Sequence, residues 1–222
     1  MGKEIDLRRK QMFRALIASG LLFIGFLTVT LQVVKSGPLV DIDKKLANIQ
    51  RPNFNTFTQF VLMRIDNLGL RGFTSSILLI CSVLIARRFK SWRPVNLSIL
   101  SLFALNFVVG VSKVAVGRTK SWTRKDLLHT GGLSYPSGHA ANALLTWGLL
   151  AYLIYRYTRR GAALRFTPAI TAGVFSFAVA SVSLLRNTHW LTDLLGGLFI
   201  GGSLLVFVIA VDRYVPSASQ RS

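Results

Sequence analysis

Six stretches of this chain carry no Asp, Glu, Lys or Arg over roughly the length of a membrane span, and they constrain its fold more than any other feature. A helix that crosses the hydrocarbon core of a bilayer needs about 20 mostly apolar residues. A chain of 222 residues is the size of one domain. We therefore expect an all-α integral membrane protein, with residues 1–222 forming a single domain of six transmembrane helices. The expected spans are residues 15–34, 72–86, 94–112, 138–155, 166–185 and 194–211.

The positive charge of the chain indicates how these spans are oriented. Lys and Arg number 27 against 8 Asp and Glu, a net charge of +19. Much of this charge lies at the N-terminus and in the connectors 87–93 and 156–165, which alternate correctly to share one side of the membrane. Cytoplasmic loops of membrane proteins collect Lys and Arg. We therefore expect both termini in the cytoplasm of a bacterial cell, and no nucleic-acid partner, because long apolar runs separate the basic clusters.

Three segments are then expected on the extracytoplasmic side of the plasma membrane, namely residues 35–71, 113–137 and 186–193. The second of them is basic, which topology does not explain, so it indicates an anionic substrate. Within the first, the apolar residues of 53–70 recur at helical spacing, with Arg64 and Asp66 among them. This pattern predicts an amphipathic helix at the membrane interface. A buried helix that caps the bundle is an equal alternative.

The first candidate catalytic residues lie where the fourth expected span begins at this outer face. Ser137 and Gly138 begin the span, and His139 follows in its first turn. The N-terminus of a helix presents free backbone N–H groups and the positive end of the helix dipole, which together bind anions. Gly138 has no Cβ to keep an anion away from the backbone. These residues therefore predict an anion site that His139 faces.

A second histidine belongs to the turn before the last expected span. His189 and Asp193 are four residues apart, so on a helix they share a face. Asp193 can then accept a hydrogen bond from one ring nitrogen, which leaves the other nitrogen free to attack an electrophile. Phosphate oxygens also require positive charge, and the basic side chains near these histidines are Lys113, Arg118, Lys120 and Arg186. Taken alone, the spacings leave two interpretations open, an anion-handling site and a set of ordinary interfacial polar residues.

These motifs resemble those of a known family. The Pro-Ser-Gly-His motif of residues 136–139, followed by the His-x-x-x-Asp pair of residues 189–193 and preceded by Lys113, resembles the phosphatidic acid phosphatase type 2 superfamily. The resemblance covers about residues 60–210. It implies the helical core that this superfamily shares with vanadium haloperoxidases and bacterial acid phosphatases.

The resemblance implies a role for each matching residue. His189 would be the nucleophile and form a phosphohistidine, Asp193 would orient it, and His139 would protonate the leaving group and then activate water. The residues that hold phosphate oxygens would be Lys113, Ser137 and Gly138. The substrate would be a lipid phosphate, either a polyprenyl phosphate or diphosphate or a glycerophospholipid phosphate. No metal ion or cofactor is implied.

At two positions the chain departs from the superfamily's motifs. Lys120-Ser121 stands where the family has Arg-Pro, and Ser183 stands where it has the arginine of its third motif. Lys keeps the charge but lacks the planar fork of Arg, and Ser removes a phosphate ligand. We expect Arg118 and Arg186, which lie nearby in the sequence, to compensate.

Three other functions are consistent with parts of this pattern. The two departures are compatible with a non-catalytic relative that binds or transports a lipid phosphate, although both histidines and the aspartate of the motifs are present. A lipid phosphotransferase would use the same residues. A haloperoxidase is disfavoured by the six apolar spans, because those relatives are soluble. We therefore expect a membrane phosphatase that hydrolyses a lipid phosphate at the extracytoplasmic face.

Overall fold

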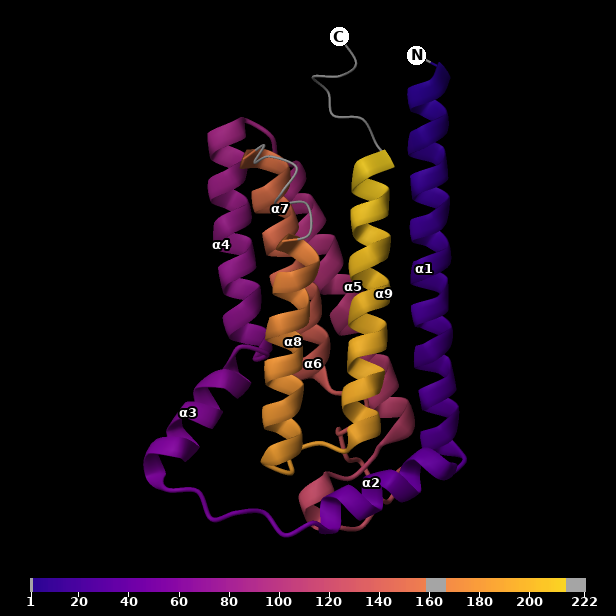
Figure 1. Ribbon diagram of the computed structural model, residues 1–222, viewed down its shortest axis with the longest axis vertical. Coiled ribbons are helices and arrows are strands. Elements are labelled where there is room, and N and C mark those ends of the chain that lie inside the picture. The colour runs from indigo at the N-terminus through magenta and orange to yellow at the C-terminus, as the bar shows by residue number, and fades with distance from the viewer. Residues whose placement is uncertain (1, 159–166, 215–222) are drawn as a thin grey trace.

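The computed structural model describes residues 2–158 and 167–214, and within them all regular structure is helical (Figure 1). Five of the helices are long and apolar enough to cross a membrane. They are α1 (Gly2–Val34), α4 (Arg71–Phe89), α5 (Arg93–Val116), α8 (Thr167–Leu185) and α9 (Leu191–Tyr214). This architecture confirms the expected all-α membrane protein. Residues 159–166, which include part of the second basic connector and the start of the fifth expected span, lie outside the described residues.

The fourth expected span is not one continuous α-helix. α6 (Gly138–Asn142) passes into a π-helical turn (Ala143–Trp147) and then into α7 (Gly148–Thr158). A π-turn inside a helix is frequent at functional sites because it shifts the side chains that precede it relative to those that follow. This segment consists of three short helical pieces, so the expected total of six transmembrane helices stays a prediction.

The last helix, α9, forms the centre of the packing that positions the site. Figure 1 shows α1 running alongside α9 over much of its length. Ser19 Oγ donates to the carbonyl of Ser203, and Ser203 Oγ donates to the carbonyl of Ser19, each over 2.9 Å. Small residues that allow close approach, with hydrogen bonds between helices, are a common means of helix association in membranes.

On another face, α9 packs closely against α6. A Cβ on Gly197 would lie 2.4 Å from the carbonyl oxygen of Ser137, and one on Gly201 would lie 2.8 Å from that of Ala141. Neither distance is possible for a carbon atom, so both positions require glycine. The backbone of Ser137 also donates to the carbonyl of Asp193 over 2.8 Å. The beginning of α6, which holds His139, and the beginning of α9, which follows His189, are therefore held side by side.

Two shorter helices lie at this end of the bundle. α3 (Thr56–Asn67) begins after Asn55, whose side chain accepts from the N–H of Thr58, and it falls within the expected helix of residues 53–70. None of its residues is buried, and its position at a membrane interface stays a prediction. α2 (Pro38–Asn48), which the sequence analysis did not predict, lies across the ends of α1 and α9 (Figure 1).

The opposite end of the bundle is joined by a different set of polar contacts. Asp212 near the end of α9 is 3% exposed. Its carboxylate accepts from Arg93 over 2.6 Å, from Tyr152 over 2.6 Å and from Arg156 over 3.1 Å. These contacts connect α5, α7 and α9 about a buried charge, far along the bundle from the histidines.

Candidate active site

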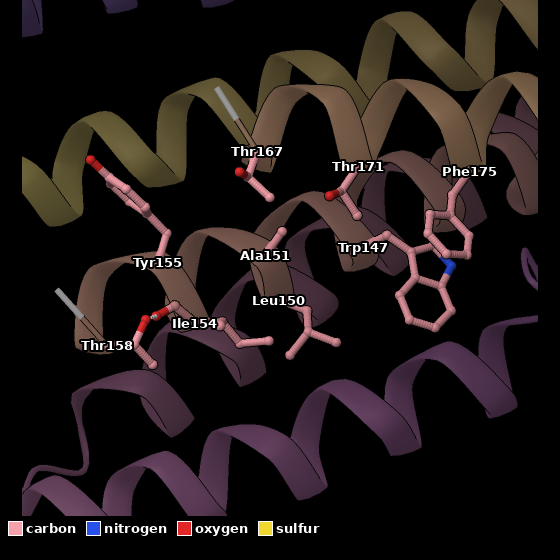
Figure 2. A pocket seen from close by; sticks show the side chains of 9 residues that line it. All are labelled: Trp147, Leu150, Ala151, Ile154, Tyr155, Thr158, Thr167, Thr171 and Phe175. Atoms are coloured by element: carbon pink, nitrogen blue, oxygen red, sulfur yellow. Dashed lines mark hydrogen bonds between the residues drawn. The ribbon is translucent and has the colours of Figure 1, made fainter. Parts of the chain in front are cut away.

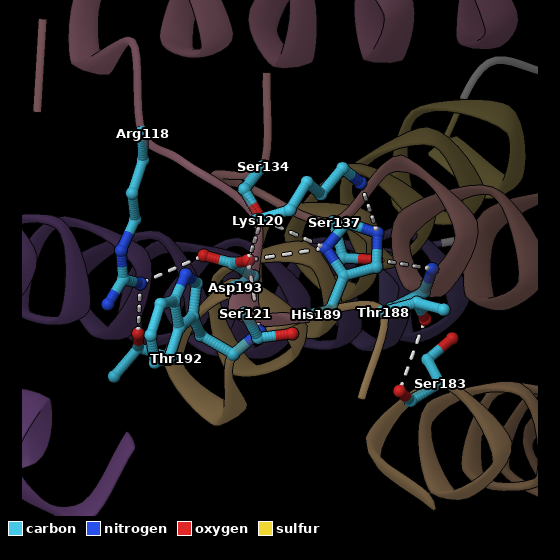
Figure 3. Close-up of polar contacts among 12 residues, drawn as sticks. Arg118, Lys120, Ser121, Ser134, Ser137, Ser183, Thr188, His189, Thr192 and Asp193 are labelled. Carbon is cyan, nitrogen blue, oxygen red and sulfur yellow. Dashed lines mark hydrogen bonds and ion pairs between the residues drawn. The ribbon is translucent and has the colours of Figure 1, made fainter. Parts of the chain in front are cut away.

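His189 lies in the turn that precedes α9 and is almost completely buried. Its Nδ1 lies 3.2 Å from Asp193 Oδ2, and its Nε2 lies 3.4 Å from Lys120 Nζ (Figure 3). Because the carboxylate accepts at Nδ1, that nitrogen carries the proton and Nε2 keeps its lone pair. Burial lowers the pKa of His189, and the hydrogen bond and charge of Asp193 offset this only in part. The neutral ring is therefore favoured, as a nucleophile requires.

Asp193 is completely buried, and its carboxylate is fully engaged. Oδ2 accepts from the hydroxyl of Ser134 and from the N–H of Trp190, the latter over 3.2 Å. Oδ1 accepts from Arg118 over 2.9 Å. A buried charge with this many donors is fixed in position, so Asp193 can hold the ring of His189 in one orientation. Ser134 lies outside the three sequence motifs and was not predicted as a site residue.

His139 lies opposite His189, with the ring centroids 6.4 Å apart. It is the second residue of α6, whose first turn is capped by the buried side chain of Ser137, which accepts from the N–H of Ala140 over 3.4 Å. A Cβ on Gly138 would come no closer than 3.9 Å to any neighbour, and that neighbour is Lys113. The space in front of Gly138 is therefore open, and Lys113 lines it.

Two lysines contribute positive charge to this space. Lys113 donates to the carbonyl of Leu133, and Lys120 is the partner of His189 described above. Ser121, which replaces the family's proline, is completely buried and donates to the carbonyl of Asn187 over 2.8 Å. This bond ties the loop that holds Lys120 to the turn that holds His189.

The expectation that Arg118 binds phosphate is wrong. Arg118 is completely buried, and all five of its N–H donors are used within the protein. Nε and one terminal nitrogen form a bidentate pair with Asp126, at 2.7 and 2.8 Å. The remaining donors bind Asp43, Asp193 and the hydroxyl of Thr192. No donor is left for a substrate, so Arg118 cannot compensate for a missing motif arginine.

Arg186 has a different environment. One of its terminal nitrogens lies 3.1 Å from Asp66 Oδ2, and Ser183 donates to the other oxygen of Asp66 over 2.9 Å. Arg186 is therefore next to the position that the family's arginine would occupy, and it is 31% exposed. The chain just after Asp66 lies next to His139, because a Cβ on Gly69 would lie 2.9 Å from the Cβ of His139. Asp66, which the sequence analysis placed only in an amphipathic helix, thus belongs to the site.

Two further features of the described residues concern metal ions and apolar ligands. Among the described residues, no group of three His, Cys, Asp or Glu side chains could hold a metal ion. An apolar hollow of about 320 Å³ lies between α7 and α8, and none of the described residues that line it is Lys, Arg, Asp or Glu (Figure 2). The stacked rings of Trp147 and Phe175, with centroids 4.5 Å apart, form one end of it. This hollow suits hydrocarbon rather than phosphate.

Comparisons with known proteins identify relatives of this chain. The sequence model of the PAP2 superfamily matches residues 97–216, which contain all three motif segments. Phosphatidylglycerophosphatase B of Bacillus subtilis (strain 168) is 25% identical over 186 residues, covering 81% of this chain and 86% of that protein. The fold matches the crystal structure of the first transmembrane PAP2 type phosphatidylglycerolphosphate phosphatase from Bacillus subtilis with a TM-score of 0.73. That match has 21% identity and covers 90% of this chain and 98% of the other.

Proposed function

The chain belongs to the PAP2 superfamily, and from this membership we propose that it is a metal-independent membrane phosphatase acting on a lipid phosphate or diphosphate. One observation carries the proposal. The buried ring of His189 is held at Nδ1 by Asp193, and a second histidine ring faces it at 6.4 Å. A phosphorus atom between the rings meets a nucleophile on one side and a proton donor on the other.

In the first step, His189 Nε2 attacks phosphorus, and the bond from phosphorus to the lipid oxygen breaks. Protonated His139 donates its proton to the departing lipid oxygen. Asp193 keeps the proton on Nδ1 and stabilises the positive charge that the ring acquires. The oxygens of the transferred group are held by Lys113, by Lys120 and by the backbone at Ser137 and Gly138.

In the second step, water replaces the lipid. His139, now neutral, removes a proton from the water as its oxygen attacks phosphorus. The bond from phosphorus to His189 breaks, and inorganic phosphate leaves. Lysine charge and backbone N–H groups supply the stabilisation of phosphate oxygens that a metal ion supplies in other phosphatases.

The substrate is a lipid because the site lies at one end of a membrane bundle and an apolar hollow lies along it. The hollow begins at Trp147, eight residues beyond His139 on the segment that α6 begins. A hydrocarbon chain attached to a phosphate at the site can extend that far. The name of the Bacillus subtilis relative makes a glycerophospholipid phosphate the first candidate, with polyprenyl phosphates and diphosphates next.

Two alternatives use the same residues. A protein that only binds or transports a lipid phosphate needs no oriented nucleophile, so the buried Asp193–His189 pair favours an enzyme. A phosphotransferase would pass the phosphoryl group from His189 to an acceptor other than water. Both alternatives predict no phosphate release in the absence of an acceptor.

The deciding experiment measures phosphate release by purified protein in detergent with EDTA present. The panel contains phosphatidylglycerophosphate, phosphatidate and a polyprenyl diphosphate, and His189→Ala is the matched control. We expect release from at least one of these lipids and none from the variant. If the folded wild type binds these lipids but releases no phosphate, with or without added acceptor lipids, the chain is not a phosphatase.

A further inference from the structure

Asp43 lies far from the motifs in sequence, yet it contacts the first turn of α9. One of its carboxylate oxygens accepts from the backbone N–H of Thr192 over 2.9 Å, and the other accepts from the hydroxyl of the same residue. The N–H groups of a first helical turn have no partner within the helix, and an acidic side chain there is favoured by the helix dipole. Asp43 therefore acts as a cap for α9, although it belongs to α2.

The same carboxylate also holds Arg118. Asp43 Oδ2 accepts from Arg118 over 2.8 Å, and another nitrogen of Arg118 donates to Asp193 over 2.9 Å. Two routes thus lead from Asp43 to Asp193, one through Arg118 and one through Thr192, the neighbour of Asp193 in the chain. Buried contacts therefore connect α2 to Asp193, which orients His189. Figure 3 shows the part of this connection from Arg118 and Thr192 through Asp193 to His189.

α2 packs against the rest of the protein through one buried face. Val40, Asp43 and Ala47 are spaced so that they share one face of the helix, and each is less than 5% exposed. Asp41, on another face, is exposed and pairs at 4.0 Å with Lys44. Only one of these two aspartates of α2 is therefore directed at the site.

The burial of Asp43 is difficult to explain by stability alone. Burial raises its pKa, and the bonds to Thr192 and Arg118 lower it only in part. A buried ion pair is often no more stabilising than apolar residues of the same volume. The cluster sets three carboxylates, those of Asp43, Asp126 and Asp193, around one guanidinium. This excess of negative charge lies next to a ring that becomes positive when it carries a phosphoryl group.

We propose that Asp43 is a positioning residue for the reaction, acting through Arg118 and Thr192 on Asp193 and hence on the ring of His189. The proposal rests on the proposed phosphatase function. It extends the machinery beyond residues 97–216, the part of the chain matched by the superfamily, to the helix that follows α1. Asp43 touches no substrate, so its loss affects the chemical step rather than the binding of phosphate.

The kinetic test compares Asp43→Asn with Asp41→Asn, the same change on the exposed face of the same helix. We expect Asp43→Asn to lower kcat about 10- to 100-fold, as small displacements of a reacting group do. KM, and inhibition by inorganic phosphate, should stay within about threefold because the phosphate contacts remain. Asp41→Asn should match the wild type. Equal kcat in the two variants, or a matching rise in KM at constant kcat, overturns the proposal.

A second variant and a second readout keep the test decisive. Thr192→Val retains the charges and removes one hydroxyl, so it should lower kcat by less than Asp43→Asn. If Asp43→Asn does not fold, this variant decides, and unchanged kcat refutes the proposal. The ¹⁵N NMR signals of His189 report its tautomer whether or not phosphate is released. A single Nδ1–H tautomer in the wild type and a mixture in the variant support the proposal, and identical signals refute it.

Discussion

Arg186 offers the sharpest test of how this site manages without the arginine of the family's third motif. It lies one helical turn from the replaced position, Ser183, and its guanidinium is bound to Asp66 at the edge of the site. Our hypothesis is that Asp66 holds Arg186 where it can reach a bound phosphate. The perturbation is Arg186→Ala, which removes the charge and leaves Asp66 bound to Ser183.

The expected magnitude follows from exposure and charge. Losing one donor to a developing negative charge raises the barrier by about 2.7–4 kcal/mol in a well-studied protease. Arg186 is 31% exposed and shares its guanidinium with Asp66, and both facts reduce the effect. We therefore expect about 2 kcal/mol, which is about 30-fold in kcat/KM. Arg186→Lys should recover only part of this, because Lys lacks the planar fork.

The assay is steady-state phosphate release from the best lipid of the panel. Arg124→Ala is the control, since Arg124 is an exposed arginine of the connector between α5 and α6 and its removal changes the net charge equally. The double variant Ser183→Arg, Arg186→Leu should restore activity, because the new arginine starts beside Asp66. Activity of Arg186→Ala within about twofold of the Arg124→Ala control would show that Arg186 only pairs with Asp66.

Three other predictions follow from the site. His189→Ala should lower turnover by orders of magnitude and abolish an acid-labile phosphoprotein. His139→Ala should lower turnover as much with lipid substrates, but much less with p-nitrophenyl phosphate, whose leaving group needs no proton. An equal loss of turnover with both kinds of substrate would show that His139 is not the general acid. Because burial lowers the pKa of His189 below 6.5 and the neutral ring attacks, the acidic limb of kcat/KM, where this ring takes up a proton, should have its midpoint below pH 6.5. An acidic limb with its midpoint above pH 6.5, the same for different substrates, would contradict this. In a Cys81→Ser background, Arg124→Cys should react with an impermeant thiol reagent in intact cells and Arg88→Cys should not, and the reverse pattern would place the site in the cytoplasm.

The spans and the motif pair could be read from the sequence because both depend on local information. A run of uncharged residues is apolar whatever surrounds it, so most of the long helices were predictable. The pair His189 and Asp193 has a spacing of four, which a turn of helix converts directly into a contact, 3.2 Å in the structure. The π-turn within residues 138–158 was not predictable, since its residues also suit an ordinary helix.

The partners of the charged residues were decided only by the tertiary structure. A sequence shows that Arg118 needs negative charge, but it does not show whether that charge is a substrate phosphate or a carboxylate from elsewhere in the chain. The fold places Asp43 and Asp193, each 75 residues away, against its guanidinium and so removes it from the substrate. Arg186, which like Arg118 follows an apolar span, stays at the rim because α3 brings Asp66 to it there. Electrostatic attraction depends on distance in space, and helix packing sets those distances.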